Sequence, residues 1–169
     1  MDALHRKPPT SFFRVQHKGS FTFYHASGEG GFESRAHYCM VYSHWINEGK
    51  FNRHLDWEDT SSEPTPFISV LDNERDAKSW AAKCFANGHR EIIIAQITGQ
   101  NLEAIDLPIE FQGCTVHLPA WKDPSGCILL STSDVRKHLR VSVRISRLSE
   151  WFALDFIPAT MIKNVTRYP

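Results

Sequence analysis

Three polar side chains stand in separate segments that otherwise read as β-strands. Arg14 lies in "SFFRVQH", Ser69 lies in "PFISVL", and Glu150 begins an apolar run in which Asp155 is the only other acid nearby. A guanidinium offers several fixed donors to an anion, and a carboxylate stabilises a developing positive charge. A strand glutamate is most often a solvated side chain on an outer face. Chemistry at Glu150 therefore requires that the fold bring the three segments together.

Other kinds of site have little support in the sequence. The four cysteines show no CxxC spacing and are expected to be buried free thiols: Cys39, Cys84, Cys114 and Cys127. His37 and His44 are seven residues apart and do not form a metal pair at the i, i+4 spacing of a helix face. The sequence therefore predicts no metal site.

Length and composition favour one ordinary globular domain over residues 1–169. Hydrophobic residues make up 41% of the chain and charged residues 22%, and the 19 basic residues balance the 19 acidic ones. This balance gives no support for a nucleic-acid or membrane surface as the partner. No apolar run approaches the roughly 20 residues that span a bilayer, and no secretory signal is recognisable at the start. A cytoplasmic or nuclear location is expected, with a secreted effector as the alternative.

The elements that must position the three residues can be predicted from periodicity and turn signals. Apolar spacing predicts a helix from Arg35 to Glu48 and another from about Asn73 to Asn87. The second helix should bury five residues along one face: Ala77, Trp80, Ala81, Cys84 and Phe85. The other predicted elements are strands at 11–17, 66–71, 91–98, 147–155 and 164–168, strand pieces around Phe111 and Val116, a strand or loop at 140–145, and short helical segments at 133–139 and 158–163. This mixture predicts an α+β class.

In this order and spacing, the three segments resemble the ADP-ribosyltransferase fold, in particular its cholera- and pertussis-toxin-like branch. That branch carries an arginine on the first strand, a serine motif before a helix, and a glutamate with Ile-Pro downstream. Arg14, Ser69 and Glu150 fall on these positions, and Ile157-Pro158 stands at the matching distance. The ending "VTRY" is similar to the pertussis-type ending. The stretch "HLDWEDTSSEPTPFISV" further resembles a family of uncharacterised fungal intracellular domains.

The resemblance implies an ADP-ribosyltransferase-like split β-sheet core with peripheral helices, and NAD as a substrate without a metal. Glu150 would be the catalytic carboxylate that stabilises an oxocarbenium-like ribose. Arg14 would hold a phosphate or ribose of NAD, and Ser69 would orient Glu150.

The resemblance also implies three further contacts with NAD. The backbone at Val15 would hold the nicotinamide amide, and His54 in "RHLDW" would contact the ribose or support catalysis. Trp80 would flank the nicotinamide, although its place on the apolar helix face favours core packing.

Departures from the family pattern leave the reaction open. Arginine-directed relatives carry an acid two residues before the glutamate, and here that position is Leu148. Val70 and Leu71 also replace the Thr and Ser of the second motif. The expected function is mono-ADP-ribosyl transfer from NAD to a protein, nucleic acid or small molecule. The alternatives are an NAD glycohydrolase, an inactive binding module of the same fold, or an unrelated small binding domain. Oligomeric state and the role of residues 107–144 have no sequence signal.

Overall fold

The computed structural model describes residues 7–20, 22–25, 30–34, 67–139 and 149–169. Two predicted segments lie entirely outside these residues: the helix at 35–48 and the strand or loop at 140–145.

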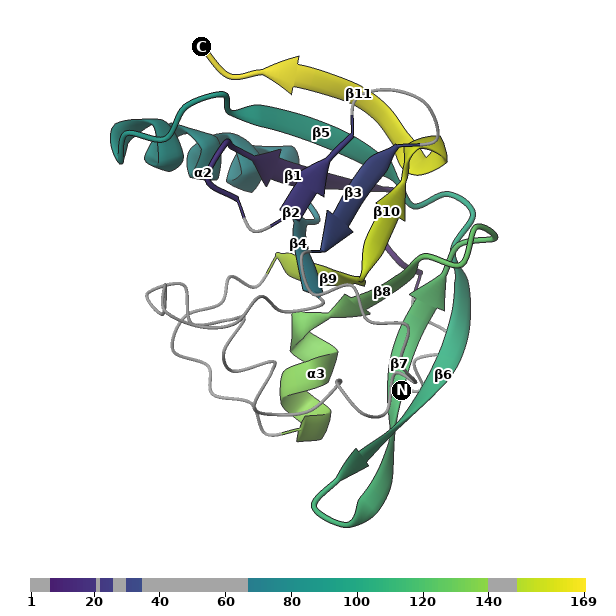
Figure 1. Ribbon diagram of the computed structural model, residues 1–169. Helices are drawn as coiled ribbons and strands as arrows, with labels where there is room; N and C mark the ends of the chain where they lie inside the picture. Colours follow the sequence, from purple (N-terminus) through teal and green to yellow (C-terminus); the bar gives the residue numbers. More distant parts are fainter. Residues whose placement is uncertain (1–6, 21, 26–29, 35–66, 140–148) are drawn as a thin grey trace.

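An antiparallel sheet of eight strands forms the body of the described chain (Figure 1). Its order is β11-β5-β1-β4-β9-β8-β7-β6. In chain order the strands are β1 (Ser11–Gln16), β4 (Phe67–Leu71), β5 (Ile93–Thr98), β6 (Glu103–Phe111), β7 (Cys114–Lys122), β8 (Ile128–Ser131), β9 (Glu150–Leu154) and β11 (Ile162–Arg167). The sheet sets β1, β4 and β9 side by side, and these are the strands that carry the three candidate residues.

A smaller sheet and a few helical segments complete the described fold. The order of the small sheet is β10-β3-β2, from β2 (Thr22–Tyr24), β3 (Gly31–Ser34) and β10 (Phe156–Pro158). Helix α2 (Glu74–Ala86) contacts β1 and β5, and helix α3 (Thr132–Leu139) contacts β7, β8 and β9. A 3-10 turn, η3 (Ala159–Met161), leads into β11. In Figure 1 the β6–β7 hairpin extends well away from the other strands.

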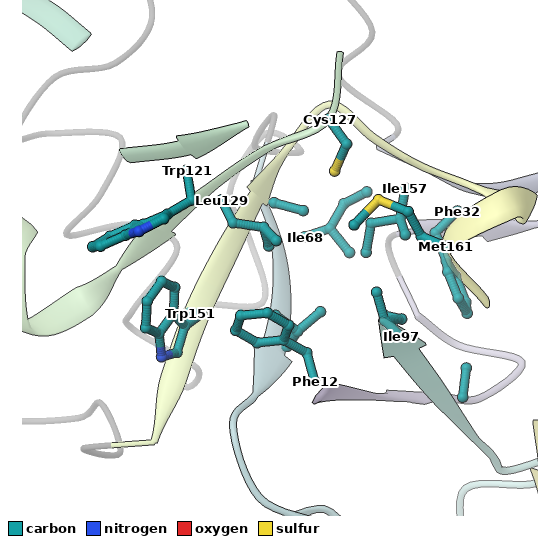
Figure 2. Close-up of a cluster of buried hydrophobic side chains, with 13 residues drawn as sticks. Phe12, Phe32, Ile68, Ile97, Trp121, Cys127, Leu129, Trp151, Ile157 and Met161 are labelled. Atoms are coloured by element: carbon teal, nitrogen blue, oxygen red, sulfur yellow. The ribbon is translucent and has the colours of Figure 1, made fainter. Parts of the chain in front are cut away.

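A shared apolar core joins the two sheets. Figure 2 shows Phe12, Trp151 and Trp121 of the large sheet gathered in one cluster with Phe32 and Ile157 of the small sheet. The rings of Trp121 and Trp151 are 5.2 Å apart between centroids, and Phe12 meets Trp151 edge-on at the same separation. A second cluster packs α3 against β4, β6, β7, β8 and β9. Burial of this kind is the main favourable contribution to folding.

The predicted α+β class, with a split β-sheet core, is wrong. The described residues hold eleven strands but only two α-helices, and most of the strands form one continuous sheet, so the fold is β-rich. The difference arises largely at residues 103–122. Sequence patterns predicted only short strand pieces there, because Pro108 and Pro119 interrupt the apolar alternation. The structure has two nine-residue strands in register over their whole length.

The helix predicted from about Asn73 to Asn87 is confirmed as α2. Asn73 caps it by accepting a hydrogen bond from the Asp76 N–H. Ala77, Ala81 and Cys84 are buried as predicted. The prediction that Phe85 is buried is wrong, because its side chain is 48% exposed and lies against Tyr168 and Arg90. At 3.6 residues per turn Phe85 lies about 80° round the helix from Ala77, at the edge of the buried face.

Candidate functional site

Three neighbouring strands hold the candidate residues close together. Arg14 is on β1, Ser69 is on β4, and Glu150 is the first residue of β9. β4 pairs with β9 along its full length, placing Ser69 opposite Phe152 and Leu71 opposite Glu150. Residues two apart on a strand share a face, so Ser69 and Glu150 are diagonal neighbours on one face of the sheet.

The Ser69 hydroxyl links β4 to the carboxylate of β9. Its Oγ donates a hydrogen bond of 2.7 Å to Oε1 of Glu150. Glu150 is completely buried, and its backbone oxygen accepts a 2.8 Å hydrogen bond from the hydroxyl of Thr132 at the start of α3. A buried carboxylate needs such hydrogen bonds, because desolvation is costly for a charged group. Glu150 is therefore held in place by both its side chain and its backbone.

Arg14 meets the same serine through its main chain. Nη1 of Arg14 donates a 3.0 Å hydrogen bond to the Ser69 carbonyl oxygen. β1 and β4 pair at one position only, Phe13 opposite Leu71. The guanidinium therefore bonds a carbonyl just beyond the point where the ladder between these strands stops. Ser69 thus touches Arg14 through its carbonyl and Glu150 through its hydroxyl.

Burial and charge act in opposite directions on Arg14. Desolvation is the larger effect and lowers the pKa of Arg14 to about 10, while the negative charge of Glu150, and to a lesser degree Cys84, raises it. A guanidinium with a pKa near 10 is still protonated at neutral pH. The site therefore holds a positive side chain within electrostatic reach of a carboxylate in a largely water-excluded setting, where charges interact more strongly than in water.

Sequence reasoning missed the acids that hold the start of β9. Asp72 accepts a hydrogen bond from the Trp151 indole, and its N–H donates to the carbonyl oxygen of Ser149. Asp76 accepts a hydrogen bond from the Ser149 hydroxyl. The residues on both sides of Glu150 are thus tied to the junction of β4 and α2. The expectation that Asp155 is the only acid nearby holds along the chain but not in space. The capping pattern "LDNERD" marks these acids, but nothing in it indicates a contact with residues 149–151.

Two of the remaining predicted residues, Val15 and Trp80, belong to one apolar cluster. Val15 pairs with Ile94 of β5, and its side chain is buried against α2. Trp80 is partly buried in the same apolar cluster, which agrees with its core-packing interpretation. His54 and Leu148 lie outside the described residues. The described part of the chain contains no group of three side chains suited to a metal ion.

A family model described only as a domain of unknown function, DUF7587, matches residues 7–168, so the chain belongs to this family. No curated protein and no solved structure matches the chain. None of the described helices is long and apolar enough to cross a membrane.

Proposed function

We propose that the Arg14–Ser69–Glu150 group cleaves the bond between nicotinamide and ribose in NAD and transfers ADP-ribose to an acceptor. The observation that carries this proposal is the convergence on Ser69: a guanidinium 3.0 Å from its carbonyl oxygen and a carboxylate 2.7 Å from its hydroxyl. The fold itself supplies no support, because fold and function are only loosely connected.

The proposed chemistry assigns one role to each side chain. As the bond between ribose C1′ and the nicotinamide nitrogen breaks, both electrons leave with nicotinamide and positive charge develops on the ribose. Glu150 stabilises this charge, Ser69 fixes the direction of the carboxylate, and Arg14 holds an anionic part of NAD. The acceptor forms a new bond to C1′ and loses its proton. When water is the acceptor, the same residues make the protein an NAD glycohydrolase.

The full burial of Glu150 sets a condition on this proposal. NAD can contact the carboxylate only if side chains that cover it are displaced when NAD binds. The same burial favours a second candidate function, a catalytically inactive binding module in which these three residues only stabilise the sheet.

A labelling experiment separates these candidates. Purified full-length protein is incubated with NAD labelled in its adenine ring, and free nicotinamide is measured together with the fate of the label. Label that becomes attached to an acceptor indicates transfer, whereas soluble labelled ADP-ribose indicates hydrolysis. If the protein neither binds NAD nor releases nicotinamide, the proposed function is wrong and the structural interpretation of the three residues holds.

A further inference from the structure

A buried glutamine next to the site, Gln16, binds Arg14 and has no role in the proposed reaction as described above. Gln16 ends β1, and only 7% of its surface is exposed. Its Oε1 accepts hydrogen bonds from both Nε and Nη2 of Arg14, at 3.2 and 2.9 Å. Its Nε2 donates to the carbonyl oxygen of Thr22 on β2. Arginine can only donate and a carbonyl oxygen can only accept, so the two partners fix the orientation of the amide.

The bonds to Gln16 and Ser69 use three of the N–H groups of the Arg14 guanidinium. A guanidinium has five N–H groups. Within the described residues, two of them bond Gln16 and one bonds Ser69, which leaves one N–H on each terminal nitrogen. Two such groups match two oxygens of a phosphate, which is a common way for arginine to bind phosphate.

The partner at this edge is a neutral amide and not a carboxylate. A carboxylate here would hold the guanidinium equally well but would cancel its charge. Gln16 holds Arg14 in place and leaves that charge uncancelled on this side. The distinction matters in a desolvated setting, where an added negative charge next to Arg14 acts strongly.

We propose that Gln16 is a positioning residue that aims the charged end of Arg14 at the pyrophosphate of a dinucleotide. This inference rests on the proposed function, because it names the part of NAD that Arg14 holds. It differs from a purely structural role, in which Gln16 only ties β1 to β2 through Thr22. A structural role predicts a change in stability but no selective change in anion affinity.

The test compares two variants that carry the same change in charge. Gln16→Glu keeps the size of the side chain and an acceptor for Arg14 but adds a negative charge. The matched control is Gln96→Glu on the neighbouring strand β5, where Gln96 donates to the Ser11 hydroxyl and has no hydrogen bond to Arg14. A third variant, Gln16→Met, removes the amide without adding charge, and it decides the question if Gln16→Glu does not fold.

Binding of inorganic pyrophosphate and of ADP-ribose is measured by calorimetry, with thermal unfolding recorded for each variant. We expect Gln16→Glu to weaken the binding of both ligands at least tenfold and Gln16→Met to weaken it about threefold. Gln96→Glu should leave the affinity for both ligands unchanged. Wild-type affinity in folded Gln16 variants, or no pyrophosphate binding by the wild type, overturns the proposal. Binding that depends on Gln16 without any nicotinamide release supports it and contradicts the proposed function alone.

Discussion

Ser69 is the residue on which the arrangement of the site depends. Its carbonyl oxygen and its hydroxyl act on different strands, so one residue fixes both Arg14 and Glu150. The hydroxyl is the replaceable part, because the carbonyl belongs to the main chain. A substitution at Ser69 therefore tests the link to Glu150 while leaving the link to Arg14 in place.

We expect Ser69→Ala to lower the free energy of unfolding by about 2 kcal/mol, because a hydrogen bond to a charged, buried acceptor is lost. Urea unfolding measures this change. In a Glu150→Gln background the same substitution should cost less, since the acceptor is then neutral. Equal costs in the two backgrounds would show that the Ser69 hydroxyl does not interact with the Glu150 charge.

At the residue scale, the sequence identified Arg14, Ser69 and Glu150 but not the other residues that hold them in place. Arg14, Ser69 and Glu150 stand out because each is polar in an apolar strand. Gln16 and Thr132 have ordinary surroundings in the sequence, and their roles arise only from contacts with Arg14 and with the Glu150 backbone. Such contacts depend on strand order, which local patterns do not contain.

Among the elements, helix α2 was the most predictable, whereas the pairing of the strands next to it could not be predicted. An N-cap and a regular apolar spacing are local signals, and both are present in residues 73–87. The pairing of β1 with β5 and β4 joins segments far apart in the chain. No local signal specifies such pairing, so the sequence predicted the strands without their order.

The turn after β1 gives a pH-dependent prediction at the element scale. His17 stacks on His89, which follows α2, with 4.0 Å between the ring centroids, and its Nδ1 accepts a hydrogen bond from the Gly19 N–H. Desolvation, followed by the nearby His89 and Arg14, lowers the pKa of His17 to about 4 from 6.5. The unfolded chain therefore takes up a proton before the folded protein does. The contribution of His17 to the free energy of unfolding is therefore fully present above pH 6.5, and it is lost as the pH falls from 6.5 towards 4.

Urea unfolding at pH 7 and pH 5 measures this effect. We expect the wild type to lose more stability between these two values than His17→Asn, in which the titrating ring is absent. Equal losses in the two proteins would show that His17 does not titrate differently on folding.

For the whole molecule, the shared core between the two sheets predicts cooperative stability. Phe32 of the small sheet is completely buried against the large sheet, whereas Phe85 on α2 is 48% exposed. We expect Phe32→Ala to cost about 3–5 kcal/mol, as for other buried phenylalanines. Phe85→Ala should cost well under about 3 kcal/mol, because about half of the surface of Phe85 is already exposed to water. Chemical denaturation of both variants measures the difference, and similar costs would contradict the assigned core.

The fold class was the least predictable feature at this scale. Individual strands such as β1 and β5 follow from alternation and β-branched residues. The continuous eight-stranded sheet requires that segments 11–16, 67–71 and 150–154 find one another, and that residues 103–122 form a long hairpin. These are long-range choices decided by burial over the whole chain. An α+β expectation based on counting local elements therefore failed.

In the proposed function, the negative charge of Glu150 promotes cleavage of NAD. Glu150→Gln keeps the shape of the side chain and an oxygen that can accept the Ser69 hydrogen bond, but it removes the charge. The most direct measurement is the rate of nicotinamide release at saturating NAD, together with NAD affinity, for the wild type and for this variant. We predict a loss of about 100- to 1000-fold in turnover with nearly unchanged affinity, because the charge acts mainly in the transition state. Unchanged nicotinamide release in a folded Glu150→Gln protein would contradict the claim.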